Sequence, residues 1–183
     1  MNVTETSIPG VFVVESSSFS DHRGAFSRLF CGDELGEVLG ERKIVQINYS
    51  RTKKKGAIRG LHYQKAPFAE MKLVRCLRGR VWDVVVDVRS ESPTFLQWHA
   101  EELSSENSKM IVIPEGCAHG FQVIESESEL LYLHTEYYTP NAECGLRFDD
   151  PLLNIAWPLL VEDISERDSK HPLLDIEFSG ISI

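Results

Sequence analysis

The sequence predicts a mainly β fold, one antiparallel domain of the jelly-roll (sandwich) or barrel type with a few short helices. Short runs rich in β-branched and aromatic residues alternate with turn signals through the middle of the chain, at the roughly 8–12-residue spacing of such folds. Helical periodicity is confined to two short stretches. The 183 residues are enough for one sizeable core, and no repeat or linker divides them. We therefore expect a single domain over residues 1–183.

A short helix and a strand are expected in the first half of the chain. "GDELGEVL" (32–39) is typical of a short surface helix. In "IRGLHYQ" (58–64) the two-residue period of a strand places Gly60, His62 and Gln64 on one face. The pattern leaves two interpretations of this histidine open, a packed structural residue or the base of an active site.

A hairpin is expected in "KLVRCLRGRVWDVVVDVR" (72–89), because the Arg78-Gly79 pair separates two apolar runs. Lys72 begins the first run and either points into a pocket or extends its amine to solvent. The two-residue period of a strand determines which side chains share a face. Val74 and Cys76 share a face with Lys72 on the first strand, and the second strand has one face with Trp82, Val84, Val86 and Val88.

A second hairpin is expected in "GFQVIESESELLYLHTEYY" (120–138), where the polar residues 125–128 separate an apolar run from another strand. One face of that second strand is unusually polar for a core. It carries Leu130, Tyr132, His134, Glu136 and Tyr138, while Leu131, Leu133, Thr135 and Tyr137 lie on the other face.

The C-terminal third, from about Pro151, is expected to pack over the barrel. Within it, "SERDSKHP" (165–172) predicts a second short helix, with Ser165 as its N-cap and Pro172 near its end. Asp168 in this stretch is, on its own, an ordinary solvated charge.

Composition excludes some classes of partner. A net charge of −9 argues against general affinity for nucleic acid or an anionic membrane, although a small anionic ligand can still bind locally. The chain starts without a signal-peptide pattern and has no membrane-spanning apolar run, so we expect a cytoplasmic protein. The four cysteines form no C-x-x-C pair and are expected to be free thiols.

A metal site is one alternative for the histidines. Small β-barrels often bind a metal through histidines and a carboxylate, and His62, Glu70 and His119 could form such a set. Position 64 holds glutamine, however, so the H-x-H pair that two inward positions of one strand would offer is absent. His119, in "IPEGCAHGF", has the same two interpretations as His62, structural or catalytic.

Arginines are the candidates for an anionic ligand. Arg23, Arg59 and Arg75 could bind phosphate with two hydrogen bonds each, or form surface salt bridges.

Six segments, in order along almost the whole chain, closely resemble the dTDP-4-dehydrorhamnose 3,5-epimerase family. They are "FSDHRGAF", "QINYSRTKKKGAIRGLHYQ", "KLVRCLRGRVWDVVVDVRSESPTF", "IPEGCAHGFQV", "LLYLHTEYYTPNAECGLRFDDPLLNIAWP" and "SERDSKHPLL". The resemblance implies a cupin-type jelly-roll homodimer that uses no metal or other cofactor. It also implies a nucleotide-diphosphate deoxysugar substrate, a 4-keto-6-deoxyhexose, in deoxysugar supply for cell-surface polysaccharide.

The chemistry implied by the resemblance is removal and return of the protons at C3 and C5, which both flank the C4 ketone. His62 is then the base, paired with Asp168. Lys72 lies near the C4 oxygen and stabilises the enolate, and Tyr132 returns a proton from the opposite face. The substrate-binding residues carried over are Arg23, Phe26, Arg28, Gln46, Asn48, Arg59, His119, Tyr138, Glu143 and Arg167.

Three positions depart from the family pattern. The family commonly has glutamate where this chain has Arg28, glutamine and a small residue where it has Glu70-Met71, and lysine where it has Leu133. These departures leave the nucleotide open between dTDP, the first choice, and CDP. A mono-epimerase, a ketoisomerase or metal cupin, and a non-catalytic sugar-nucleotide binding protein stay as alternatives.

Overall fold

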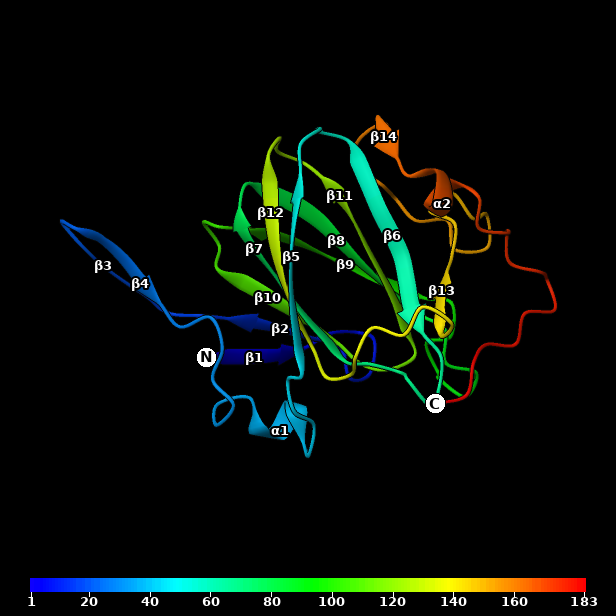
Figure 1. Cartoon of the computed structure of the whole chain (residues 1–183), viewed down its shortest axis with the longest axis horizontal. Coiled ribbons are helices and arrows are strands. Elements are labelled where there is room, and N and C mark those ends of the chain that lie inside the picture. Colours follow the sequence, from blue (N-terminus) through cyan, green and yellow to red (C-terminus); the bar gives the residue numbers. More distant parts are fainter.

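The computed structural model describes all 183 residues and consists of two facing β-sheets with a projecting hairpin (Figure 1). Strands within the first sheet are antiparallel, as the sequence predicts. In spatial order it contains β1 (Asn2–Glu5), β2 (Phe12–Glu15), β10 (Lys109–Ile113), β7 (Lys72–Arg78), β12 (Ser128–His134) and β5 (Gln46–Thr52).

The second sheet carries the strand that contains His62. Its order is β13 (Glu143–Gly145), β6 (Ala57–Gln64), β11 (Cys117–Val123), β8 (Arg80–Asp87) and β9 (Trp98–Ser104), and β14 (Asp163–Ile164) adds a parallel pairing to β6. The two helices, α1 (Gly36–Leu39) and α2 (Glu166–Ser169), have four residues each. Neither is long and apolar enough to cross a membrane.

The main core lies between the two sheets. Val74 and Leu130 of the first sheet and Val85 and Phe121 of the second are buried in one cluster there. Because the strands alternate, their other residues face outward, and Val84 and Val86 of β8 form a separate cluster on the outside of the second sheet. A strand with apolar residues on both faces is therefore buried from both sides.

Both predicted hairpins are wrong, although the strands on either side of each turn are present. β7 lies in the first sheet and β8 in the second, and β12 and β11 are divided between the sheets in the same way. The chain passes from sheet to sheet at Gly79, whose φ is +74° and where a Cβ would lie 2.5 Å from Ser128 Oγ. A close two-residue turn and a corner between sheets require the same turn residues, so the sequence pattern could not separate them.

The C-terminal segment lies along the outside of the second sheet (Figure 1). Leu153 is buried there, and Trp157, Leu174 and Phe178 pack against the same cluster. Ser165 caps α2 by accepting a hydrogen bond from the Asp168 amide.

Two predicted elements are shorter than expected. The first helix covers only the second half of residues 32–39, because Leu35 is buried before it and Gly40 ends it. The polar strand ends at His134, so the alternation does not continue to Glu136 and Tyr138.

The hairpin of β3 (Ser18–Asp21) and β4 (Gly24–Ser27) extends away from both sheets (Figure 1). Phe19 and Phe26 are register partners in this hairpin, and each is 74% exposed.

Candidate active site

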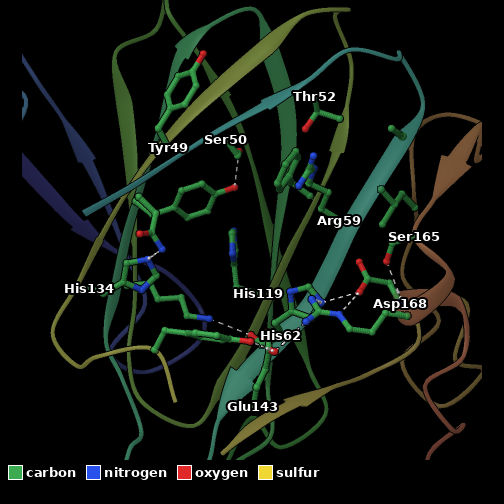
Figure 2. Close-up of a pocket in the computed structure, with 18 of the residues that line it drawn as sticks. Tyr49, Ser50, Thr52, Arg59, His62, His119, His134, Glu143, Ser165 and Asp168 are labelled. Carbon is green, nitrogen blue, oxygen red and sulfur yellow. Dashed lines mark hydrogen bonds and ion pairs between the residues drawn. The ribbon is translucent and has the colours of Figure 1, made fainter. Parts of the chain in front are cut away.

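A pocket of about 920 Å³ opens between the sheets, a size that suits a ligand larger than a single sugar. β5, β7 and β12 form one wall, β6 and β11 form the other, and α2 lies at its edge (Figure 2). Ten of the residues singled out from the sequence line it: Asn48, Arg59, His62, Lys72, His119, Tyr132, Tyr138, Glu143, Arg167 and Asp168.

The other four predicted substrate-binding residues lie outside the pocket lining. Arg23 and Phe26 are on the projecting hairpin, where Arg23 pairs with Asp21 at 2.6 Å. Arg28 follows that hairpin and forms an ion pair with Glu34. Gln46 lies behind the lining and donates to Asn48 Oδ1 at 3.3 Å.

His62 and Asp168 form a hydrogen-bonded pair, with Nε2 and Oδ1 separated by 2.9 Å. The Gly60 amide donates to the other carboxylate oxygen at 3.2 Å. Burial by itself would raise the pKa of Asp168, but the hydrogen bond and charge of His62 and the Gly60 amide together hold it well below its usual range. An ionised carboxylate only accepts hydrogen bonds, so in the neutral form of His62 this contact requires the hydrogen on Nε2 and leaves a free lone pair on Nδ1.

A cation faces the same pair. The Arg167 guanidinium lies 3.0 Å from His62 Nε2 and donates to Glu143 at 2.8 Å. Potential metal ligands of His62, Asp168 and His171 lie within 4.8 Å of one another, but the Arg167 guanidinium is 3.0 Å from His62 Nε2 and 3.3 Å from Asp168 Oδ1, and its positive charge opposes a metal cation beside them. The set considered from sequence, with Glu70 and His119, is not assembled, because these two residues pair with other partners.

Lys72 is buried with its amine inside the pocket, so the solvent-exposed alternative does not hold. Its Nζ donates to the His62 carbonyl oxygen at 3.2 Å and pairs with Glu70 Oε1 at 3.1 Å. These contacts hold a positive charge between the two walls of the pocket.

Tyr132 reaches the pocket from the sheet opposite to His62. Its hydroxyl lies 3.1 Å from Ser50 Oγ, and its ring stacks on His134 with an interplanar angle of 18°. Burial raises the pKa of Tyr132 strongly, so the phenol stays protonated across the physiological range. A phenol that keeps its proton is available as an acid.

His119 is held by a buried carboxylate. Its Nε2 lies 2.9 Å from Asp83 Oδ2, and Asp83 has no exposed surface. Burial raises the pKa of Asp83 against the opposing effect of His119. His119 therefore combines a buried hydrogen bond to Asp83 with a position in the pocket wall.

Glu143 joins two exposed pocket residues at the open edge. The Tyr138 hydroxyl donates to Glu143 Oε2 at 2.8 Å, and Arg167 donates to the same oxygen. This acceptor raises the pKa of Tyr138. Arg59 is exposed in the opposite part of the pocket wall, so guanidinium groups from two elements face the cavity.

Arg75, a phosphate candidate from sequence, lies elsewhere. It is 2% exposed, outside the pocket, and donates to Ser108 O and Ser16 Oγ. Neither phosphate binding nor a surface salt bridge fits this position.

Ser50 and His134 line the pocket but were not assigned a role from the sequence, and Glu70 was considered there only as a metal ligand. Ser50 shares a strand face with Gln46 and Asn48, and that run of polar residues two apart was a usable signal. From the sequence, His134 was identified only as part of the polar strand face, and Glu70 only as an alternative metal ligand and as a departure from the family pattern.

Comparison with known proteins finds the same relatives by sequence and by structure. The dTDP-4-dehydrorhamnose 3,5-epimerase family model matches residues 5–175. The Salmonella typhimurium protein of that name is 42% identical over 177 residues, covering 96% of each chain. A Legionella pneumophila epimerase, solved with dTDP-4-keto-L-rhamnose, has a TM-score of 0.91 at 39% identity, covering 100% of this chain and 98% of its own. A Bacillus anthracis epimerase, solved with TDP and PPi, has a TM-score of 0.91 at 36% identity, covering 94% and 99%.

Proposed function

The chain belongs to the dTDP-4-dehydrorhamnose 3,5-epimerase family, and from this premise we propose that it inverts C3 and C5 of a dTDP-linked 4-keto-6-deoxyhexose. One observation in particular supports the proposal. His62 and Tyr132 enter a single pocket from opposite sheets, with the Lys72 amine in the same pocket. Inversion needs a base on one side of the carbon and an acid on the other, and these two residues supply that pair.

In this proposal His62 removes the proton through Nδ1. Asp168 fixes the ring through Nε2–H and stabilises the imidazolium that forms when Nδ1 takes the proton. The electron pair of the broken C–H bond moves to the C4 oxygen and gives an enolate. C3 and C5 are both adjacent to C4, so one base and one oxyanion position serve both centres.

Lys72 and Tyr132 complete the step. The Lys72 ammonium stabilises the negative charge on the C4 oxygen. Tyr132 then donates its phenolic proton to the carbon from the face opposite His62, which inverts the centre. The Ser50 hydroxyl at 3.1 Å is a hydrogen-bond partner for the Tyr132 oxygen during this transfer.

The nucleotide diphosphate is assigned to the open part of the pocket. Arg59 and Arg167 supply guanidinium groups for phosphate oxygens, and Asn48, His119 and Tyr138 supply further polar contacts.

A second copy of the chain belongs to the same proposal. Arg23, Phe26 and Arg28 lie on or beside the projecting hairpin and do not line the pocket of their own chain. We assign them to the pocket of a partner in a homodimer. The four free cysteines suit a reducing compartment, so we also propose a cytoplasmic location and one functional domain over residues 1–183.

Proton exchange tests the reaction directly. The protein is incubated with dTDP-4-keto-6-deoxyglucose in deuterated water, and label at C3 and C5 is followed by NMR. Wild type should label both carbons, and His62→Ala should lower exchange at both by about 10²–10⁴-fold. Tyr132→Phe should still exchange a proton but form little inverted product. Label at one carbon only would restrict the activity to mono-epimerisation, and near-normal exchange in His62→Ala would show that another group is the base.

A further inference from the structure

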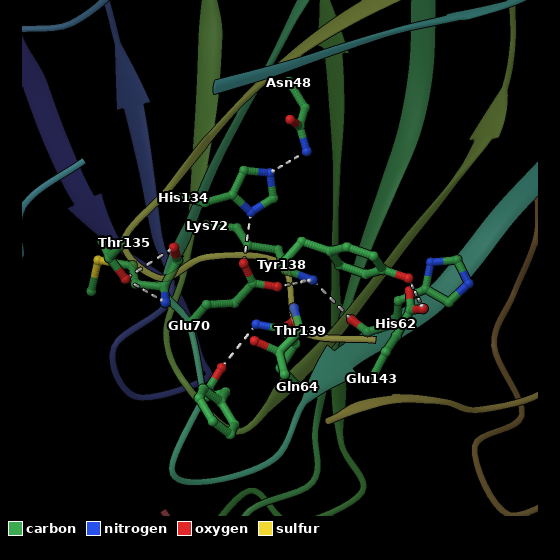
Figure 3. Close-up of polar contacts among 12 residues, drawn as sticks. Asn48, His62, Gln64, Glu70, Lys72, His134, Thr135, Tyr138, Thr139 and Glu143 are labelled. Carbon is green, nitrogen blue, oxygen red and sulfur yellow. Dashed lines mark hydrogen bonds and ion pairs between the residues drawn. The ribbon is translucent and has the colours of Figure 1, made fainter. Parts of the chain in front are cut away.

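Glu70 and His134 line the pocket wall with their side chains largely covered, and the proposed reaction uses neither of them (Figure 3). The strand pairing places them together. His134 is the register partner of Lys72, and Thr135 contacts both backbone polar groups of Met71. The backbone pairing of His134 with Lys72 and the contacts of Thr135 with Met71 therefore hold Glu70 beside His134.

Glu70 and His134 belong to a series of hydrogen bonds, and the donor-to-acceptor direction of that series is fixed at the Tyr138 end. The backbone N–H of Tyr138 can only donate, and its acceptor is Gln46 Oε1 at 3.1 Å. The amide nitrogen of Gln46 then faces Asn48 Oδ1 at 3.3 Å, and the amide nitrogen of Asn48 faces His134 Nε2 at 3.3 Å. Each side-chain amide accepts with its oxygen and donates with its nitrogen. Because Gln46 must accept from Tyr138, Gln46 donates to Asn48 and Asn48 donates to His134.

The direction determines the tautomer of His134. Nε2 accepts from Asn48, so the ring hydrogen is on Nδ1 and is donated to Glu70 Oε2 at 2.7 Å. The other oxygen of Glu70 pairs with Lys72 Nζ at 3.1 Å. Glu70 therefore receives donors on both oxygens, which a carboxylate can accept and an amide cannot.

Burial by itself would raise the pKa of Glu70, but the hydrogen bond from His134 and the charge of Lys72 lower it, so the carboxylate stays ionised. The ammonium of Lys72 has three N–H donors. One is used by Glu70 and one by the His62 carbonyl oxygen, which leaves a single donor for the pocket.

We propose that Glu70 and neutral His134 are positioning residues that orient the Lys72 ammonium so that its one remaining N–H is directed at the C4 oxygen of the substrate. Both nitrogens of His134 and both oxygens of Glu70 are already hydrogen-bonded, so these residues act through Lys72 and do not bind the sugar themselves. The catalytic part of this inference rests on the proposed epimerase function.

Glu70→Gln is the sharpest test, because it removes one acceptor and changes little else. Two donors, Lys72 Nζ and His134 Nδ1, would then face one amide oxygen, and the fixed direction of the hydrogen-bond series prevents His134 from changing tautomer. We expect kcat to fall about tenfold or more with KM changed less than about threefold. In Glu70→Gln/His134→Ala the second donor is absent, the amide oxygen is free for Lys72, and kcat should recover to within about threefold of wild type.

Glu129→Gln is the matched control. Glu129 is on the same strand as His134, outside the pocket, and its nearest ion-pair partner, Arg78, is 3.8 Å away, so kcat should not change. A wild-type kcat in Glu70→Gln, or a loss that the second substitution does not reduce, would overturn the positioning role. A raised KM at constant kcat would mean that Glu70 binds the substrate directly.

A spectroscopic test separates the geometry from the reaction. In ¹⁵N-labelled wild-type protein, the ring nitrogens of His134 are identified by their loss in His134→Ala. We expect hydrogen on Nδ1 alone, and hydrogen on Nε2 or on both nitrogens would overturn the inference. This result needs no substrate, so it stands apart from any failure of the exchange assay, which would reject the proposed function instead.

Discussion

At the scale of single residues, Asp168 decides how His62 can act. Its carboxylate orients the ring through Nε2 and also accepts the Gly60 amide. In Asp168→Asn the amide can present its NH₂ to Nε2, which favours the tautomer with hydrogen on Nδ1 and blocks the proposed base. We expect kcat to fall by about 10²–10⁴-fold with the fold retained, measured by deuterium exchange and circular dichroism. Activity within tenfold of wild type would show that Asp168 does not control the base.

The same residue predicts a dependence of stability on pH. The pKa of Asp168 is lower folded than unfolded, so its contribution to the free energy of unfolding is complete above the unfolded value, near 4. That contribution is lost as the pH falls below this value toward the folded pKa. In urea denaturation, the stability difference between wild type and Asp168→Asn should shrink from pH 7 to pH 3. A constant difference would contradict the lowered pKa.

Sequence reasoning found individual site residues better than it found their partners. His62 and Lys72 each had two interpretations from their strands alone, and only the family resemblance favoured the catalytic one. Burial of the Lys72 amine could not be predicted, because it depends on the His62 carbonyl oxygen of another strand, which approaches only after folding. His134 was placed on the correct polar face, but its partner 64 residues earlier left no local signal.

At the scale of elements, strand positions were predictable and strand pairing was not. The period of two identified β7, β8, β11 and β12 because apolar residues recur on their faces. Pairing depends on which sheet a strand joins after a turn, and the turn at Gly79 is compatible with either outcome. The polar stretch at 125–128 is equally uninformative. The jelly-roll class was therefore correct while the local hairpins were wrong.

Gly60 provides a test of how β6 and β11 hold the site. Its φ is +113°, and a Cβ would lie 2.6 Å from both Gly120 Cα and the His119 carbonyl oxygen. Gly60→Ala should lower the free energy of unfolding by about 2 kcal/mol or more, measured by urea denaturation. It should also lower exchange activity, because the Gly60 amide binds Asp168. The control is Gly36→Ala in α1, where a Cβ meets no atom within 4 Å and stability should be unchanged or slightly raised.

At the scale of the whole molecule, the two sheets separate the chemical roles. The proposed base, His62, comes from the second sheet, and the proposed acid, Tyr132, and Lys72 come from the first. Packing between the sheets, through residues such as Val74 and Phe121, therefore sets the distance between base and acid. The sequence could predict the antiparallel jelly-roll class, but the distance across the pocket follows only from how the whole core packs.

The projecting hairpin gives the whole-molecule prediction. A two-stranded hairpin is at best marginally stable alone in water, and this one exposes Phe19 and Phe26 by 74% each. A partner copy that covers these rings would stabilise it and receive Arg23 at its pocket. Light scattering should give twice the 20.7 kDa chain mass for wild type. Phe19→Ser/Phe26→Ser should shift the mass toward one chain at low concentration and weaken dTDP binding.

Leu160→Ser is the control for this loss of apolar surface, because Leu160 is 85% exposed and lies far along the chain in the C-terminal segment. If exposed apolar area alone governed association, this variant would also dissociate. If the hairpin is the specific contact, Leu160→Ser should keep the dimer mass and its affinity for dTDP. A wild-type protein that remained a single chain up to high concentration would reject the homodimer. The roles of Arg23, Phe26 and Arg28 would then have to be sought within one chain.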